Sequence, residues 1–308
     1  MIARTDIPSL LQAKDDFRHR LSGEFGRESL AYVVPLPEEG LGLIAYTWVN
    51  AASEAGYAVF VWDKDEVVAF ESTDAVAMGD ADFDDWRIGG LRVTQTDALR
   101  SFDLQHHGNE ISFELAADAI SPAFAYGDHP LGTPRFMADQ RWEQSLLAKG
   151  RLQLGSRSIE IDGAMARDHS WGRRDWHYAQ HWKWIHVIED ERNALHFWEL
   201  FVRGRREVRG YVVRDGVMTV VATADVDSKL TAQGVQERVW GTVTDACGVE
   251  TRFEVDIACV WNFRVHPGWA LCESAAWATF EGRRARAHAE FAWPQSYLDH
   301  LEAHGADD

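Results

Sequence analysis

The ten residues from Arg167 to Trp176 concentrate the side chains of this protein that could carry chemistry. They read Arg-Asp-His-Ser-Trp-Gly-Arg-Arg-Asp-Trp, with two carboxylates, three arginines, one histidine and two tryptophans. A surface loop seldom carries two tryptophans, and a core strand seldom carries so many charges. The mixture predicts ionised groups held among bulky apolar walls, where charges must be paired.

Proton transfer is the chemistry that this stretch favours. In an extended strand, neighbouring side chains point to opposite faces, so Asp168 and His169 would face opposite ways, and Gly172 would then allow a bend. A carboxyl or imidazole group placed beside an apolar substrate can protonate or deprotonate it. We predict Asp168, His169 and Asp175 as catalytic candidates, without deciding which is the acid. The alternative is a structural arginine–aspartate network that braces a barrel mouth.

Tryptophan is frequent here, with 14 in 308 residues. Indole rings can wall a pocket for an apolar ligand, stabilise a developing carbocation or simply fill a thick core. Glu199 is a second carboxylate if its strand points inward, and Glu273 and Glu290 raise the same question. His129 lies in a loop that could cap a pocket. The residues predicted to bind substrate are Trp171, Arg173, Arg174, Trp176, Trp184, Trp198, Glu199 and His129.

The elements that must position these residues read as short antiparallel strands. Apolar runs alternate with turn formers, most clearly at Asp215-Gly216, a pair typical of a type I′ hairpin turn. Repeated hairpins without βαβ alternation predict antiparallel sheets, which close into barrels to hide their edges. We predict an all-β protein of two barrel halves, with short helices near residues 8–21 and 294–304. A single large sandwich is the alternative.

A stretch rich in proline and glycine, residues 121–134, predicts a connection between the halves. We place the boundary near residue 138. Residues 1–138 would then form an N-terminal barrel-like domain. Residues 139–308 would form a C-terminal one that carries the polar motif.

The charge of the chain bears on its partners. With 49 acidic and 31 basic residues, the formal net charge is −18, which disfavours nucleic acid and anionic membranes as partners. The densest basic stretch, Arg203–Arg209, has Glu207 interleaved and is typical of a solvated strand edge. No apolar run is long enough to span a membrane. The expected partner is therefore a hydrophobic small molecule.

The three cysteines, Cys247, Cys259 and Cys272, form no CxxC pair. Their odd number and spacing predict neither disulfides nor a structural metal, and favour a reducing, cytoplasmic location. The chain also contains neither a GxGxxG nor a GxxxxGK[ST] motif, so no nucleotide cofactor is expected.

The polar motif resembles that of a known bacterial family. Arg167–Gly172 and Arg174–Trp176, preceded by Trp142-Glu143-Gln144, are similar to the RDHSWGxRDW signature of proteins related to hydroxyneurosporene synthase (carotenoid 1,2-hydratase) and to AttH-type lipocalin-like proteins. The likeness covers roughly residues 141–176. It implies two lipocalin-like β-barrels and chemistry without a redox cofactor on a hydrophobic, often polyene or terpenoid, substrate. Asp168 and His169 match the motif positions on which that chemistry would depend.

Two functions follow from these observations. The first is a cofactor-independent hydratase, lyase or isomerase that acts on a terpenoid- or steroid-like molecule by proton transfer in a tryptophan-lined pocket. The second is a lipocalin-like carrier that binds such a molecule unchanged. The polar motif favours the enzyme, because buried charges only weaken the binding of an apolar ligand.

Overall fold

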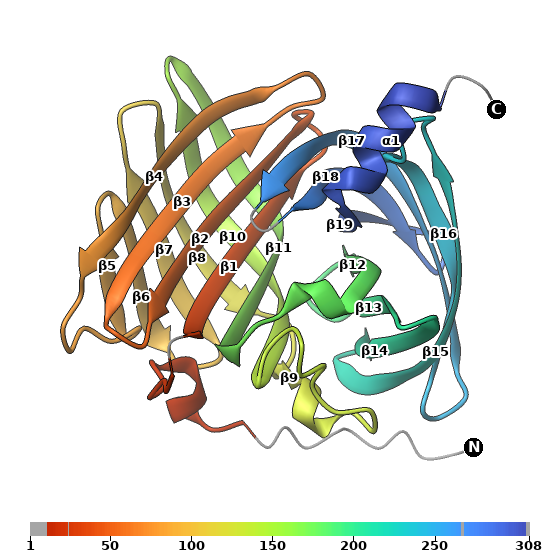
Figure 1. Ribbon diagram of the computed structural model, residues 1–308, viewed down its shortest axis with the longest axis horizontal. Helices are drawn as coiled ribbons and strands as arrows, with labels where there is room; N and C mark the ends of the chain where they lie inside the picture. Colours follow the sequence, from red (N-terminus) through yellow and green to blue (C-terminus); the bar gives the residue numbers. More distant parts are fainter. Residues whose placement is uncertain (1–10, 24, 266–267, 306–308) are drawn as a thin grey trace.

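The computed structural model describes residues 11–23, 25–265 and 268–305 and consists of two antiparallel β-structures that lie side by side (Figure 1). The first is an 11-stranded sheet with the order β4-β3-β2-β1-β11-β10-β8-β7-β6-β5, in which β9 also pairs with β10. The second is a closed barrel of the consecutive strands β12 to β19. The prediction of an all-β protein with two barrel-like halves is confirmed.

The first sheet is nearly closed, and we call it the first barrel. Glu71 of the edge strand β4 bonds across the gap to the hairpin of β7 and β8. Its carboxylate accepts hydrogen bonds from the backbone N–H groups of Glu110 and Ile111 (2.8 and 3.1 Å) and from Nε2 of His106 (3.3 Å). The strands are β1 (Gly26–Leu36), β2 (Leu41–Asn50), β3 (Glu54–Trp62), β4 (Val67–Ala77), β5 (Asp85–Ile88), β6 (Leu91–Asp97), β7 (Ser101–His107), β8 (Ile111–Ala119), β9 (Phe124–Ala125), β10 (Gln140–Leu154) and β11 (Arg157–Arg173).

The second barrel is an up-and-down meander in which each strand pairs with the next and β19 closes on β12. The predicted turn at Asp215 and Gly216 is confirmed, with φ values of 54° and 81°. The strands are β12 (Ala179–Ile188), β13 (Ala194–Val202), β14 (Arg205–Arg214), β15 (Val217–Leu230), β16 (Gln236–Asp245), β17 (Glu250–Val265), β18 (Trp269–Phe280) and β19 (Arg283–Pro294).

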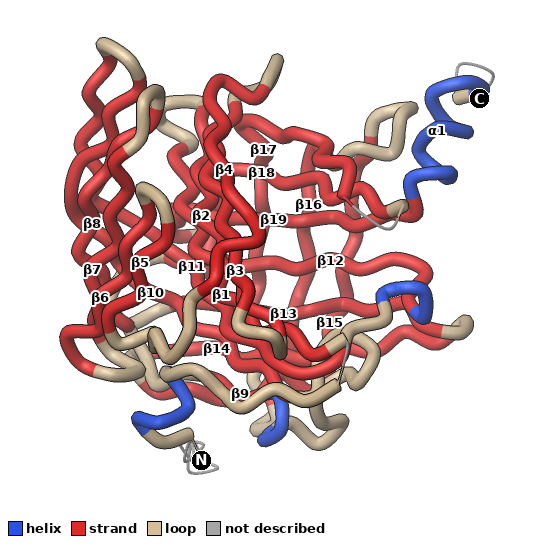
Figure 2. Tube along the Cα trace, turned by 60° about the vertical axis from the view of Figure 1, so that its left-hand side comes forward, coloured by secondary structure: helices blue, strands red, loops and turns tan. Residues whose placement is uncertain are grey.

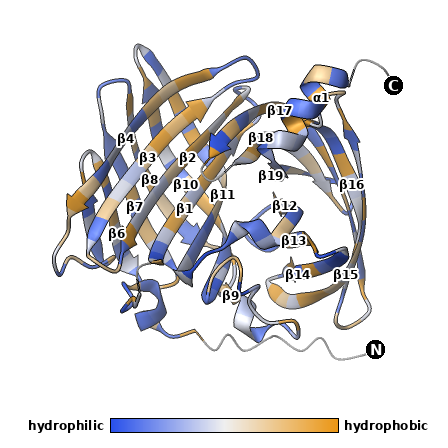
Figure 3. Ribbon diagram, in the orientation of Figure 1, coloured by the Kyte–Doolittle hydropathy of each residue, from blue (hydrophilic) through white to orange (hydrophobic). Residues whose placement is uncertain are grey.

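Apolar side chains form a core inside each barrel and a third core between them. The alternation along the strands that builds these layers is visible in Figure 3. The core inside the first barrel includes Trp86 and Phe102, and that inside the second includes Phe197. The third joins the outer faces of both barrels, from Trp62 of β3 to Trp184 of β12. In this contact, β1 crosses β18 and β19.

The predicted boundary near residue 138 does not coincide with the division between the barrels. β10 and β11 pair within the first sheet, so the chain passes to the second barrel between Arg173 and Ala179. The polar motif therefore lies in the first barrel. The stretch rich in turn formers is instead a loop before β10 that reaches across, where Tyr126 and His129 bond to the second barrel.

The helices are short. The predicted C-terminal helix is present as α1 (Gln295–His304), and its Leu298 packs on the core of the second barrel. Of the predicted N-terminal helix, residues 8–10 lie outside the described residues, and the rest holds only the 3-10 turn η1 (Ala13–Asp16). Two further 3-10 turns are η2 (Tyr126–Asp128) and η3 (Trp176–Tyr178).

The segment around η1 lies along the lower end of the first barrel in Figures 1 and 2 and is anchored to its interior. Asp16 is fully buried, and its Oδ2 accepts a hydrogen bond from Arg167 of β11 (3.3 Å). The Arg167 guanidinium also donates to Gln144 (2.9 Å) and lies over the rings of Phe102 and Trp142. A charge from the motif thus fixes the N-terminal segment.

Replacing Asp16 should expose the cost of that buried charge. We expect Asp16→Ala to lower the free energy of unfolding by about 3–5 kcal/mol, because Arg167 would keep its charge in an apolar site without a carboxylate. Urea unfolding followed by near-UV circular dichroism measures this. The control is Glu39→Ala, which removes an exposed partner of Arg157 and should cost about 1 kcal/mol or less. Equal losses in both variants would contradict the expectation.

Candidate active site

The polar motif serves two sites, because its side chains alternate across β11. Arg167 and His169 point into the first barrel, where they meet its buried aromatic residues. Asp168 points the opposite way, toward the second barrel, and bonds to Arg141. The expected separation of Asp168 from His169 on opposite faces of a strand is what the structure shows.

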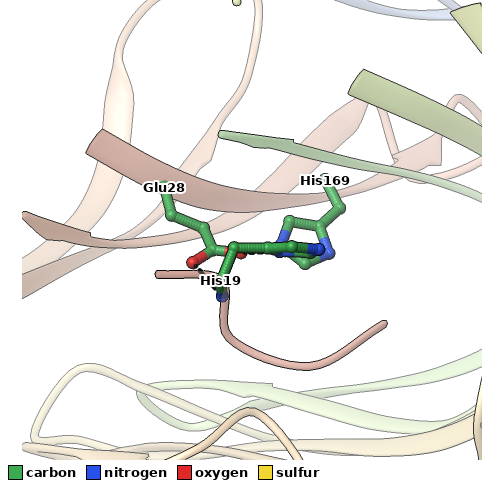
Figure 4. A group of neighbouring side chains, drawn as sticks. All are labelled: His19, Glu28 and His169. Atoms are coloured by element: carbon green, nitrogen blue, oxygen red, sulfur yellow. Dashed lines mark hydrogen bonds and ion pairs between the residues drawn. The ribbon is translucent and has the colours of Figure 1, made fainter. Parts of the chain in front are cut away.

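His169 is hydrogen-bonded to Glu28 next to His19 of the N-terminal segment (Figure 4). One oxygen of Glu28 accepts hydrogen bonds from Nε2 of His169 (2.7 Å) and Nδ1 of His19 (2.6 Å), and the His19 ring stacks on Trp171 at 3.6 Å. Burial raises the pKa of Glu28, but the hydrogen bonds from His169 and His19 outweigh burial and lower it, so the carboxylate is ionised. His19, Glu28 and His169 could together hold a metal ion, but the hydrogen bonds among them already explain their arrangement.

Asp168 lies in the layer between the barrels and keeps about 7% of its surface exposed. Its Oδ2 accepts a hydrogen bond from Arg141 (2.9 Å), whose Nε donates to Glu143 (2.6 Å). Burial raises the pKa of Asp168 to about 6, and the nearby Arg141 charge only partly opposes this. Asp168 can therefore exchange a proton near neutral pH.

Two of the predicted tryptophans surround this pair. The Arg141 guanidinium lies 4.7 Å from the ring centre of Trp198 and 5.8 Å from that of Trp184. Trp184 also donates its Nε1–H to Glu143 at 3.0 Å. The indoles from β12 and β13 thus exclude water from the ion pairs and strengthen them.

Glu143 connects the motif to two histidines of the second barrel. His196 bonds to the hydroxyl of Tyr126 (2.7 Å), and His186, whose Nε2 lies 3.6 Å from Glu143, stacks on His196 at 4.1 Å. Burial lowers the pKa of both histidines well below the ordinary value, so they are neutral. Glu143, His186 and His196 are close enough to hold a metal ion, but the charge of Arg141 beside them disfavours a second cation.

A pair of carboxyl groups lies on the facing wall of the second barrel. Glu273 of β18 and Glu290 of β19 share a hydrogen bond, and Glu290 also accepts one from Trp182 Nε1. Burial raises the pKa of Glu273 to about 7 and that of Glu290 well above its ordinary value. Like charges this close cannot both ionise, so the pair holds at least one proton near neutral pH.

The neutral His288 completes this wall. Its Nδ1–H donates to the carbonyl of Ser274 (2.8 Å), and its Nε2 lies 3.0 Å from Glu273. Burial lowers the pKa of His288 to about 4, so the imidazole accepts rather than donates at Nε2. Glu273 alternates along β18 with Leu271 and Ala275, which pack in the core between the barrels, so it faces the layer that also holds Asp168.

Two further predicted residues border this site. Arg174 donates to the hydroxyls of Ser29 and Ser170, next to Asp168 on the outer face of β11. Trp176 contacts Trp182 edge to face, with ring centres 5.5 Å apart. Gly172, which precedes both, has a φ of 106° and lies so close to Asp139 that a side chain there would collide with it.

The remaining predicted residues lie elsewhere. Arg173 and Asp175 are at the surface end of β11, where they line a separate cleft. Glu199 points into the second barrel and binds Lys183 (2.7 Å) and Arg206. His129 is buried in its loop, where Nε2 bonds to the carbonyl of Val221 (3.1 Å).

Several residues of the site were not predicted, and all of them lie outside the motif. One signal was available: within β12 and β19, polar or indole side chains occur at alternate positions of otherwise apolar strands, which marks one polar face. These residues are Tyr126, Arg141, Glu143, Trp182, His186, His196 and His288.

Two antiparallel β-barrels with a buried acid site between them define a double-barrel, lipocalin-like protein. The chain belongs to the family described as a domain of unknown function, DUF7064, whose profile matches residues 12–295. No curated protein matches the sequence. No helix of the described residues has the length and apolar character needed to cross a membrane.

Solved structures share this fold at low sequence identity. A candidate AttH protein from Nitrosomonas europaea is similar with a TM-score of 0.63 and 14% identity, covering 94% of this chain and 98% of its own. Kievitone hydratase from Nectria haematococca has a TM-score of 0.61 and 11% identity, covering 96% and 95%. CghA with Sch210972 has a TM-score of 0.59 and 12% identity, covering 87% and 88%. The resemblance to AttH-type proteins holds for the fold; that to hydroxyneurosporene synthase stays a prediction.

The raised pKa of Glu273 predicts a loss of stability with rising pH. The unfolded chain releases this proton near pH 4.5 and the folded chain only near pH 7, so stability falls between these values. The full effect is about 3 kcal/mol. Because Asp168 and Glu290 face the same space, the quantity to measure is the difference between wild type and Glu273→Gln.

We therefore expect Glu273→Gln to flatten the decline of unfolding free energy between pH 4.5 and 7, measured by urea unfolding at several pH values. The exposed Glu302→Gln is the control and should keep the wild-type slope. Parallel curves for wild type and Glu273→Gln would show that this carboxyl ionises freely in the folded protein.

Proposed function

We propose that this protein is a cofactor-independent hydratase, lyase or isomerase that transfers protons to and from a hydrophobic small molecule between the two barrels. The observation that carries the proposal is a protonated carboxyl pair, Glu273 and Glu290, that faces an acid of intermediate pKa, Asp168, within tryptophan walls. A purely structural interface gains little from three buried acids, because burying them costs free energy.

The chemistry follows from the protonation states. A proton from the Glu273–Glu290 pair adds to one carbon of an alkene, and the neighbouring carbon becomes cationic. The faces of Trp182 and Trp184 favour that cation. In a hydration, water then bonds to the cationic carbon while the Asp168 carboxylate accepts the proton that the water releases. In an isomerisation, Asp168 instead removes a proton from an adjacent carbon.

Arg141 has a positioning role in this scheme. Its guanidinium fixes the orientation of Asp168 and, because it holds the pKa of that carboxyl below the value that burial alone would produce, it keeps part of the carboxylate ionised at neutral pH. A general base works best when its pKa lies near the working pH. The value of about 6 meets that condition.

The structural neighbours support the proposal at the level of the fold. One is a hydratase by name, kievitone hydratase, and another, CghA, was crystallised with the small molecule Sch210972. A terpenoid- or steroid-like substrate for the present protein rests on the apolar, indole-rich walls. The cytoplasmic location stays a prediction.

The roles of Asp168 and Glu273 are tested by conservative substitution. We expect Asp168→Asn and Glu273→Gln each to lower turnover by about 10²–10⁴-fold, the range for one general acid or base, with affinity nearly unchanged. In the wild type, turnover should fall as pH rises through 7, because Glu273 loses its proton. The matched control is Asp162→Asn, an exposed aspartate of the same strand.

The measurement combines quenching of tryptophan fluorescence by a panel of terpenoids, steroids and fatty acids with mass spectrometry of each mixture. A product heavier or lighter by one water, or isomerised at constant mass, identifies the reaction. If Asp168→Asn loses affinity and folded structure together, the cluster is a structural network and the proposed chemistry is wrong.

A second candidate function, a carrier without catalysis, is favoured by a pocket at one end of the second barrel. The pocket has a volume of about 780 Å³. Among its walls are Phe201, Phe291, Trp293 and Tyr297, and its polar groups include Lys183, which binds Glu199. Apolar walls with few polar groups are typical of ligand sites.

Ser228 lies half-buried at this pocket and can be used to block it. If the protein is a carrier here, Ser228→Trp should weaken ligand binding by about tenfold or more, because the indole fills the entrance. Glu273→Gln should leave that binding unchanged. Fluorescence titration of both variants separates the two sites: loss in Ser228→Trp alone supports the carrier, and full binding by Ser228→Trp excludes this pocket.

A further inference from the structure

A surface cleft beside the end of β11 is positively charged, although the chain as a whole carries a net charge of −18. The cleft has a volume of about 460 Å³ and lies between residues 133–136, the end of β11 and the hairpin that joins β13 to β14. Its carboxylates are those of Asp175 and Glu207. Its arginines are Arg135, Arg173, Arg203, Arg205 and Arg209.

Most of these guanidinium groups have no carboxylate partner among the residues that the structure describes. Glu207 pairs with Arg209 (3.0 Å) and more loosely with Arg205 (3.6 Å). Among the described residues, none forms a salt bridge with the other three arginines of the cleft, Arg135, Arg173 and Arg203. In a protein where acids outnumber bases, this local excess of cations marks a place that can receive an anion.

Arg209 gives the cleft a preformed polar base. It is only 4% exposed, its Nε donates to the carbonyl of Gly132 (2.7 Å), and its orientation is therefore fixed. Its Nη1 is buried and has no hydrogen-bond partner in the described part of the chain. A buried N–H group without a hydrogen-bond acceptor costs free energy, and an oxyanion that enters the cleft would supply that acceptor.

Apolar surface lies next to the charges. Phe136, Pro134 and Val202 line the cleft, and the exposed ring of Tyr178 lies 4.9 Å from the guanidinium of Arg203. Arginine binds carboxylate or phosphate oxygens through paired N–H groups, whereas these side chains suit an aromatic or aliphatic body. The lining therefore fits a ligand with both parts better than it fits a bare ion.

We propose that this cleft binds a small organic anion, with its carboxylate or phosphate group on the arginines and its apolar body against Phe136 and Tyr178. The site goes beyond the proposed function and does not depend on it. It would give a binding role to the stretch 203–209, for which the sequence favours a solvated strand edge. Within that stretch Arg206 turns away to Glu199, and the other three arginines line the cleft.

The test uses three probes: 2-naphthoate, its neutral amide 2-naphthamide, and inorganic phosphate. Binding is measured by isothermal titration calorimetry on the full chain. The variant is Arg135→Gln combined with Arg203→Asn. Both residues are exposed, and asparagine tolerates the positive φ of 51° at position 203, so the fold should be retained. The control is Arg238→Gln, which removes an exposed arginine of β16 outside the cleft.

We expect naphthoate to bind the wild type about tenfold or more tightly than naphthamide, and the double variant to lose about tenfold or more of that affinity. Arg238→Gln and Glu273→Gln should bind naphthoate like the wild type, which separates this site from the proposed active site. Equal affinity for naphthoate and naphthamide, or no loss in the double variant, would overturn the proposal. Phosphate binding as tight as naphthoate binding would show that the apolar walls take no part and would refute the organic class of ligand.

Discussion

The guanidinium of Arg141 is the charge on which the interface between the two barrels depends. It is the only group shown to bond to both Asp168 and Glu143 among the described residues, and it does so at 2.9 and 2.6 Å beneath two indole rings. Without it, two buried carboxylates would lose their ion-pair partner, at a cost of several kcal/mol. The ion pairs therefore specify how the outer face of β10 and β11 meets β12 and β13.

Strand β11 links the interface between the barrels to the interior of the first barrel. Because side chains of β11 alternate, each position of the motif that turns outward to the acid site has a neighbour that turns inward. Asp168 is thus flanked by Arg167 and His169, which hold Asp16 and Glu28 at the lower end of the first barrel. The inward pairs fix the backbone of β11, and this in turn limits where Asp168 can lie. One short motif positions a reactive group and also provides the rigid support that it needs.

The amino-acid pattern predicted local features and failed where distant segments meet. The strands, the Asp215–Gly216 turn and the alternation around Asp168 follow from local periodicity, and all agree with the structure. The boundary near residue 138 failed because turn formers mark any loop, whether it joins two domains or two strands of one sheet. Whether β11 pairs with β1 or opens a new barrel depends on contacts more than 130 residues apart, which no local pattern contains.

The carboxyl pair Glu273 and Glu290 shows that the sequence pattern also does not reveal whether a buried side chain keeps its proton. A glutamate within an apolar strand can point to solvent, to a barrel interior or to a partner domain, and its pKa differs among the three. Glu199, Glu273 and Glu290 all lie within apolar strands. Glu199, however, forms ion pairs with Lys183 and Arg206. For Glu273 and Glu290 the structure shows no cation bonded to either among the described residues, so burial dominates and both keep their protons more tightly. Proton-donating character is therefore set by the absence of a nearby cation, and this becomes visible only when both barrels are in place.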